Sequence, residues 1–263
     1  MTYQAITVDV SDNIATITLN RPERLNACSL EMAGEINDAL SSDVQQARCL
    51  VITGAGKGFC SGADLAVKGS ASRAVTGGEG SYVALTRHYN PLMMSLARLD
   101  MPIISAVNGA AAGVGCSIGL AADFVIAGKS GYFLQAFVNI GLIPDGGASW
   151  MLPRLVGKAR ATEMMMLGEK IYADKAAEWG MIYKCVEDAD LQAEARALAL
   201  RLANGPTIAY AHMRRNILTA LENSYAEALL AEAEGQRVAG SSEDAREGTK
   251  AFLQKRKAEF KGA

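Results

Sequence analysis

The chain has 263 residues, of which 50% are hydrophobic and 21% charged, and its formal net charge at pH 7 is -2. Such a chain can bury a substantial core as one large domain or two small ones, and its small net charge argues against nucleic acid or an anionic membrane as the main partner. Five cysteines without metal-ligand spacing indicate reduced thiols. We expect a cytoplasmic protein, because the N-terminal residues lack the basic-then-apolar order of a signal peptide.

Strand and helix patterns alternate through the first half of the chain. Residues 6–10 and 14–19 alternate apolar and polar side chains around Ser11, Asp12 and Asn13, which predicts a β-hairpin. The elements predicted next are a helix over 29–40 with Ser29 as its cap, a strand over 49–53, a helix over 81–99, a strand over 103–107, a helix over 115–121 and a strand over 124–127. This alternation indicates an α/β protein.

Residues 103–122 carry no charge, so a membrane-spanning helix is an alternative for this segment. Ser105, Asn108 and Ser117 lower its hydrophobicity, and its clustered glycines disfavour one continuous helix. We therefore expect no membrane span.

Helical patterns dominate after about residue 188. The predicted helices cover 191–202, 208–221, 225–238 and 242–257. Residues 204–206, Asn-Gly-Pro, separate the first two as a stop followed by a proline-initiated helix. By pattern alone this region could be a self-contained helical subdomain.

Two Gly-rich turns and one carboxylate carry the chemistry. Residues 59–65 and 108–117 each begin as a short apolar strand, break into a Gly-rich turn and open a helix. Backbone N–H groups at such a turn have no partner inside the helix, and two converging turns would offer a donor pair to an oxyanion. Downstream, residues 141–147 add Asp145 in an apolar setting. A donor pair with one candidate base points to enolate chemistry on a carbonyl compound.

The order and spacing of residues 62–65, 108–115 and 141–147 resemble the three signature blocks of the crotonase (enoyl-CoA hydratase/isomerase) superfamily. The likeness runs nearly end to end, from Leu19 to Arg256. It implies an α/β fold of the crotonase type, in which repeated ββα units form a spiral and a helical trimerisation region follows at the C-terminus.

The resemblance also implies how the chain is organised and what it binds. Residues 1–200 would form the spiral core with the acyl-CoA site, and residues 201–263 the helical oligomerisation region of a homotrimer or a dimer of trimers. The expected partner is an acyl-CoA thioester substrate. We expect no metal, and no cofactor beyond the coenzyme A moiety of that substrate.

Site residues follow from the same resemblance. It assigns the two oxyanion donors to the backbone N–H groups of Ala63 and Val114. The residues that it places near coenzyme A are Arg24, Ala27, Asp64 and Leu65, with Phe252 and Lys255 from this or a neighbouring subunit. An ammonium group close to a phosphate is physically sensible.

A hydratase of this superfamily holds two glutamates, and the aligned positions here carry Ser117 and Phe137. Neither side chain can act as a general base near neutral pH. Asp145 is expected to be the single base, which suits an isomerase that moves one proton between two carbons. An apolar pocket lined by Phe137, Leu142 and Trp150 should raise the pKa of Asp145.

Several alternatives stay open. Residues 136–157 resemble the 1,2-epoxyphenylacetyl-CoA isomerases most closely, yet the chain could be an enoyl-CoA hydratase that uses Asp145 and Ser117 to activate water. It could also be a non-catalytic acyl-CoA binder. Asp145 could cap the helix that begins at residues 146–147, alone or in addition to acting as the base. Residues 69–80 could form a lid over the acyl pocket or a plain surface loop.

Overall fold

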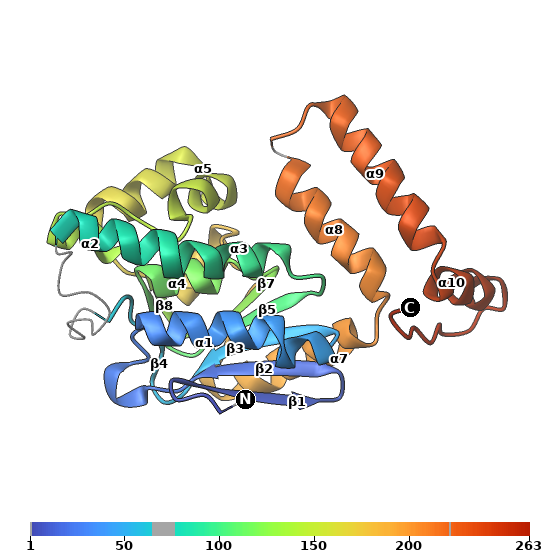
Figure 1. The fold of residues 1–263 in the computed structure, drawn as a ribbon, viewed down its shortest axis with the longest axis horizontal. Coiled ribbons are helices and arrows are strands. Elements are labelled where there is room, and N and C mark those ends of the chain that lie inside the picture. The colour runs from blue at the N-terminus through green and yellow to red at the C-terminus, as the bar shows by residue number, and fades with distance from the viewer. Residues whose placement is uncertain (1, 65–76, 221) are drawn as a thin grey trace.

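A computed structural model describes residues 2–64, 77–220 and 222–263, and the strands of this part of the chain form two sheets (Figure 1). The large sheet contains, in spatial order, β1 (Ile6–Ser11), β2 (Ile14–Leu19), β3 (Cys49–Gly54), β5 (Ile103–Val107), β7 (Phe124–Gly128) and β10 (Lys184–Val186). The small sheet contains β4 (Gly58–Cys60), β6 (Ala110–Ala112), β8 (Tyr132–Leu134) and β9 (Ile171–Tyr172). The pairs β1–β2 and β8–β9 are antiparallel, and all other neighbouring strands are parallel.

From β3 to β8, successive strands alternate between the two sheets. Strands β3, β5 and β7 lie in the large sheet, and β4, β6 and β8, which follow them directly, lie in the small one. The helices are α1 (Leu30–Ser41), α2 (Gly77–Ala84), α3 (Asn90–Arg98), α4 (Val114–Leu120), α5 (Ala148–Leu167), α6 (Ala173–Glu178), α7 (Leu191–Ala203), α8 (Thr207–Ala220), α9 (Tyr225–Gly240) and α10 (Glu243–Leu253). Short 3₁₀ segments cover Pro22–Arg24, Asp43–Gln46, Ala136–Ile140 and Asp188–Asp190. This is the spiral of ββα units with C-terminal helices that the sequence resemblance implies, so the predicted fold class is confirmed.

Local sequence signals account for the first elements. Asp12 and Asn13 both adopt positive φ angles, 52° and 59°, which a tight two-residue hairpin turn requires. The Ser29 hydroxyl accepts a hydrogen bond from the backbone N–H of Met32 at 3.1 Å and caps α1, as predicted. The helix predicted over 81–99 is a continuous helical stretch from α2 to α3, with a π-helical segment, Leu85–Tyr89, in its middle.

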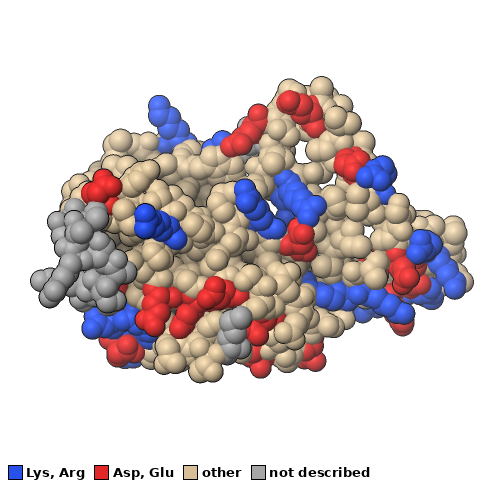
Figure 2. All heavy atoms as spheres, viewed as in Figure 1, with Lys and Arg blue, Asp and Glu red and all other residues tan. Residues whose placement is uncertain are grey.

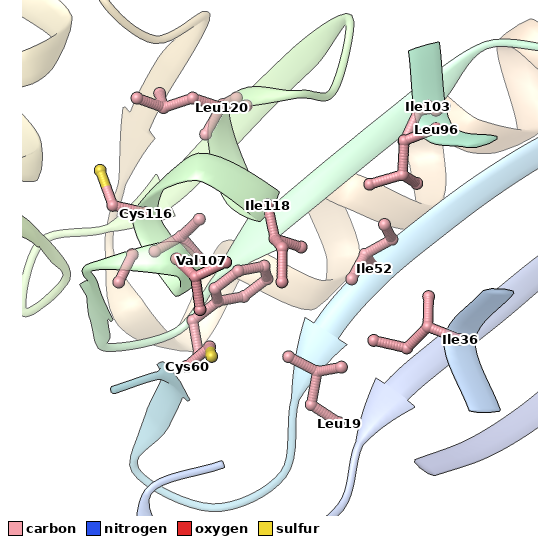
Figure 3. Close-up of a cluster of buried hydrophobic side chains, with 14 of the residues drawn as sticks. Leu19, Ile36, Ile52, Cys60, Leu96, Ile103, Val107, Cys116, Ile118 and Leu120 are labelled. Carbon is pink, nitrogen blue, oxygen red and sulfur yellow. The ribbon is translucent and has the colours of Figure 1, made fainter. Parts of the chain in front are cut away.

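The alternating side chains of β3 contribute to two separate hydrophobic cores. Cys49 and Val51 pack with Leu191 and neighbouring residues of α7 on one face of the large sheet. Leu50 and Ile52 point to the opposite face and join the main core. Figure 3 shows how this main core reaches the small sheet. It contains Leu19, Ile36 and Ile52 from the large sheet and α1, and Cys60, Cys116 and Ile118 from β4 and α4.

The last helices extend away from the two sheets (Figure 1). Arg214 of α8 ties this arm to the core, because its Nε donates to both carboxylate oxygens of Asp123 at 2.7 and 2.8 Å and its Nη2 donates to the carbonyl of Leu96 at 3.2 Å. Helix α7 packs on the large sheet and ends at Ala203. The predicted boundary between the spiral core and the oligomerisation region, at residues 200/201, falls inside this helix and stays a prediction. Helix α10 ends at Leu253, earlier than predicted, and Lys255 beyond it has a positive φ of 52°.

Large apolar side chains lie exposed on this arm. They are Met213, Ile217, Tyr225, Leu229, Leu230, Phe252 and Leu253. Basic and acidic side chains are interspersed over the face seen in Figure 2. Among the helices of the described residues, none has both the length and the apolar character that crossing a bilayer requires.

Candidate functional site

The first Gly-rich turn follows β4 and is held by a parallel β-bridge between Cys28 and Ala63. The N–H of Cys28 donates to the carbonyl of Gly62 at 2.7 Å, and the N–H of Asp64 donates to the carbonyl of Cys28 at 3.0 Å. In such a bridge the central residue makes neither bond itself, so the N–H of Ala63 points away from Cys28. Gly62 has a φ of 115°, a conformation that favours glycine.

The second turn lies where β6 ends and α4 begins. Gly113, with a φ of 53°, is the N-cap of α4, and Val114 is the first helical residue. The N–H groups of Cys116 and Ser117 both donate to the carbonyl of Gly113, at 3.0 and 3.3 Å. The N–H of Val114 belongs to the first turn of the helix, whose N–H groups have no intrahelical acceptor.

The structure brings these two turns together. Strands β4 and β6 pair in parallel, so their carboxyl ends meet at one edge of the small sheet. A Cβ atom added to Gly62 would lie 3.3 Å from the carbonyl oxygen of Ala112, and one added to Gly113 would lie 3.6 Å from Cα of Gly62. A Cβ atom on Gly115 would lie 2.3 Å from the carbonyl oxygen of Cys60, so glycine is required for this approach. Two amides so placed could share one oxyanion.

Asp145 is a half-buried residue in the turn before α5. Its Oδ1 is shielded from solvent and has no hydrogen-bond partner among the described residues. Desolvation of the carboxylate raises the pKa of Asp145 from its ordinary value of 3.8 to about 6. A carboxyl group with this pKa is available in both protonation states near neutral pH.

The side chain of Asp145 does not cap α5, so the capping alternative is wrong. The N-cap of α5 is Gly147, with a φ of 82° and no side-chain cap. It is the backbone carbonyl of Asp145 that accepts a bond from the N–H of Ala148, at 3.1 Å. The carboxyl group is therefore not used as a helix cap.

The Asp145 turn lies directly on α4, the helix that begins with the second donor. The hydroxyl of Ser117, which is 0% exposed, donates to the carbonyl of Asp145 at 2.9 Å. A Cβ atom on Gly146 would lie 2.7 Å from Cβ of Ser117 and 3.5 Å from Cγ2 of Val114. Candidate base and candidate donor are thus parts of one packed unit.

Comparison with known proteins agrees with this geometry. Residues 9–263 match the sequence profile of the family described as enoyl-CoA hydratase/isomerase.

The chain belongs to the enoyl-CoA hydratase/isomerase family.

Two relatives with different names are equally similar to this family member. It is 43% identical over 262 residues to a "probable enoyl-CoA hydratase" of Rhodobacter capsulatus, with all of both chains covered. It is also 43% identical over 255 residues to the 1,2-epoxyphenylacetyl-CoA isomerase of Escherichia coli, covering 96% of this chain and 97% of the relative. The crystal structure of an enoyl-CoA hydratase from Bacillus anthracis superposes with a TM-score of 0.90 at 31% identity, covering 99% of this chain and 100% of the other.

The sequence resemblance places Ser117 and Phe137 at the two hydratase glutamate positions, and neither residue is a carboxylate. Ser117 is buried, and its hydroxyl is engaged with the Asp145 backbone. The ring of Phe137 lies beside the second turn, because a Cβ atom on Gly113 would be 3.5 Å from its Cζ. The other two predicted pocket residues lie differently: Leu142 is 49% exposed, and the indole N–H of Trp150 donates to Glu222 at 2.7 Å.

Asp64 sits at the centre of an ionic cluster beside the first turn. Its side chain is 3% exposed and lies 2.7 Å from Nη2 of Arg21 and 3.7 Å from Nη1 of Arg24. Arg21 also donates to the carbonyl of Ala27 at 2.9 Å. These contacts hold the loop before α1 against the donor turn. Leu65 lies outside the described residues.

Phe252 and Lys255 do not join the site within one chain. Phe252 is 83% exposed at the end of α10, and Lys255 follows two residues after that helix. Figure 1 shows α10 at the opposite end of the molecule from α4 and its neighbouring turns. Residues 69–80 are expected to form either a lid or a plain surface loop; residues 69–76 lie outside the described part of the chain, and 77–80 begin α2.

Two supporting residues had no role in the sequence-based site. Tyr89, in the π-helical segment, is buried, and its hydroxyl donates to the carbonyl of Cys28 at 2.7 Å. The amide nitrogen of Asn26 donates to the carbonyls of Ala55 and Gly58 at 2.9 and 2.7 Å. Asparagine tolerates a positive φ, which is 55° at Asn26, so its residue type is a weak sequence signal for a structural role in this loop. In the sequence, Tyr89 cannot be distinguished from an ordinary helix residue.

Proposed function

We propose that this family member is an acyl-CoA isomerase, which shifts a double bond in an enoyl-CoA or carries out a related thioester rearrangement through an enolate. One observation carries the proposal. The Asp145 carboxyl group lies beside the second donor turn and its Oδ1 has no hydrogen-bond partner among the described residues, whereas Asp64 beside the first turn is paired with Arg21. The sequence resemblance places Ser117 and Phe137 at the positions of the hydratase glutamates. Syn addition of water needs a second acid–base group that these two residues do not supply.

The proposed reaction moves one proton within the substrate. The N–H groups of Ala63 and Val114 hold the thioester oxygen, and the Asp145 carboxylate takes a proton from the α-carbon. The electron pair left on that carbon delocalises onto the oxygen and gives a dienolate, which the two donors stabilise. The protonated carboxyl group then gives its proton to the γ-carbon, and the double bond ends one position closer to the thioester at unchanged mass.

Burial gives Asp145 the acid–base properties that this cycle requires. The carboxyl group must be ionised for the first transfer and protonated for the second. A pKa of about 6, raised by desolvation, makes the two transfers more evenly matched than a surface aspartate would. Each donor amide contributes about two to three orders of magnitude in rate in other oxyanion holes.

We also propose that the coenzyme A moiety of the substrate binds along the loop of Arg24 and Ala27 and contacts residues Asp64 and Leu65. Lys255 and Phe252 would come from a neighbouring subunit, because α10, which contains Phe252 and ends two residues before Lys255, lies at the opposite end of the molecule from α4 (Figure 1). The exposed apolar side chains of the C-terminal arm support a homotrimer or dimer of trimers. Light scattering on the purified protein measures this assembly directly.

The substitution Asp145→Asn tests the proposal. Purified wild-type and variant proteins are given a panel of 3-enoyl, 2-enoyl and ring-epoxide CoA thioesters, and products are followed by mass and ultraviolet absorbance. We expect the wild type to rearrange at least one thioester at constant mass and the variant to lose this activity. Asp9→Asn, which changes an exposed carboxylate on β1, is the matched control and should retain full activity.

The same panel decides between the proposal and its alternatives. Wild-type hydration of crotonyl-CoA at an ordinary enzyme rate of about 10 per second, detected as the mass gain of one water, would favour a hydratase. Tight acyl-CoA binding by calorimetry without any turnover would favour a non-catalytic binder. Unchanged isomerisation by Asp145→Asn would remove this residue from the mechanism.

A further inference from the structure

The carbonyl oxygen of Asp145 is bonded from two helices. On one side it accepts from the N–H of Ala148 at 3.1 Å, in the first turn of α5. On the other side it accepts from the hydroxyl of Ser117 at 2.9 Å, in the middle of α4. A carbonyl oxygen has two lone pairs, and both are used here, so the backbone of Asp145 is fixed between α4 and α5.

Gly146 is tightly packed against the side chain of Ser117, beside this hydrogen bond. Gly146 has a φ of 59°, and a Cβ atom added to it would lie 2.7 Å from Cβ of Ser117. The turn therefore rests directly on the Ser117 side chain. Ser117 acts on the turn both as a hydrogen-bond donor and as a surface for packing.

Ser117 also lies on the same short helix as the second oxyanion donor. Val114 begins α4, and Ser117 follows three residues later, which is close to one helical turn. Every residue of α4 is buried, so the helix is held on all sides. The Asp145 backbone is thus tied one turn away from the amide that would bind the thioester oxygen.

We propose that Ser117 is a positioning residue of the reaction, whose hydroxyl fixes the base Asp145 relative to the oxyanion donor Val114. This inference rests on the proposed isomerase function. In this reaction the carboxyl group must reach two carbons while the oxygen stays in place, so its position relative to Val114 determines the rate. A displacement of about 1 Å at a reacting group costs on the order of 100-fold in rate.

Ser117→Ala removes the hydroxyl and keeps the rest of the residue. We expect kcat for isomerisation of a 3-enoyl-CoA to fall about 10- to 100-fold, while KM stays within about twofold, because coenzyme A binds elsewhere. Ser105→Ala is the matched control. Ser105 on β5 is also 0% exposed, but its hydroxyl has no hydrogen-bond partner among the described residues, so this variant should keep the wild-type kcat.

The pH profile of kcat separates positioning from a general loss of structure. Cys28 and Tyr89 interact electrostatically with Asp145, and burial raises the pKa of each, so both are uncharged near neutral pH. The acid limb of the profile should therefore report Asp145. In Ser117→Ala the loosened turn should expose the carboxyl group to water, and we expect its pKa, and hence the acid limb, to move to lower pH.

Each outcome decides the role of Ser117. If Asp145→Asn is inactive but Ser117→Ala has the wild-type kcat and pH profile, the positioning role is wrong and the isomerase proposal stands. An equal loss of kcat in Ser105→Ala would also refute it. Should Ser117→Ala fail to fold, Ser117→Cys, whose thiol is a weak donor, replaces it, and a fully active Ser117→Cys would overturn the role.

A failure of the isomerase proposal would be recognised separately, as full activity in Asp145→Asn. In that case carbon-13 NMR of the labelled Asp145 carboxyl group tests the role of Ser117 without any substrate. A pKa that falls in Ser117→Ala would support the positioning of this carboxyl group by Ser117. A pKa that is the same in both proteins would refute it.

Discussion

Replacing the candidate base should stabilise the folded protein at neutral and alkaline pH. The pKa of Asp145 is raised by burial from 3.8 to about 6, so the folded state holds this proton more tightly than the unfolded state does. The folded state therefore loses stability as the pH rises from about 4 to about 6, and it carries the full cost of an ionised, half-buried carboxylate above that interval. Asp145→Asn is uncharged at every pH and avoids this cost.

The size of the effect follows from the shift. About two pK units correspond to about 3 kcal/mol, which we reduce to about 1–2 kcal/mol because the carboxyl group is partly exposed and water screens it. Asp145→Asn should unfold at a temperature roughly 2–4 °C above the wild type at pH 8, and the difference should vanish below about pH 4, where the carboxyl group is protonated in both states. Thermal unfolding of both proteins at one matched concentration measures this, with Asp9→Asn as the control. A less stable Asp145→Asn at pH 8 would refute the burial argument.

Two further predictions concern the second donor turn and the attachment of the C-terminal helices. Gly115→Ala should lower the free energy of unfolding by at least about 3 kcal/mol or prevent folding, because its Cβ atom would lie 2.3 Å from the carbonyl oxygen of Cys60. Gly34→Ala in α1 is the control: no atom lies within 4 Å of the added Cβ, so it should stabilise the protein by about 0.5–1 kcal/mol. Urea unfolding measures both variants. Arg214→Ala should destabilise by about 2–4 kcal/mol, since it removes the cation beside the Asp123 carboxylate, which keeps only the hydrogen bond from the Ile103 N–H. Hydrogen exchange in α8 should rise more than in β5, and equal exchange in both would contradict the idea that Arg214 ties the arm to the core.

The sequence predicts those parts of the fold that depend on strong local signals, such as turn residues and helix caps. The hairpin rests on Asp12 and Asn13 at positive φ, and α1 begins after the Ser29 cap. The start of helix α5 is expected at residues 146–147, but its extent is not predicted, because Pro153 interrupts the helical pattern and Gly157, with φ 76° and ψ 164°, kinks the helix. Two strands of the small sheet, β4 and β6, are indicated by the apolar residues that precede the Gly-rich turns. Strands β8 and β9 have three and two residues, too few to show a period of two, so the sequence pattern does not predict them.

The candidate site was predictable where a glycine marks a backbone conformation with positive φ. Gly62 and Gly113 mark the two turns, and both adopt positive φ. The tie between Ser117 and the Asp145 carbonyl could not be foreseen, because it joins residues 28 positions apart through a backbone atom that every residue type carries. The role of Tyr89 could not be predicted for a similar reason, because its hydroxyl donates to a backbone atom, the carbonyl oxygen of Cys28.

Transfer of an isotopic label tests the single-base mechanism most directly. A 3-enoyl-CoA that carries deuterium at the α-carbon is converted in ordinary water, and the product is examined by NMR for deuterium at the γ-carbon. Because Oδ1 of Asp145 is shielded from solvent, we predict that part of the label reaches the γ-carbon and that Asp145→Asn abolishes this transfer. A γ-hydrogen that comes entirely from solvent, or the same transfer in Asp145→Asn, would contradict the mechanism.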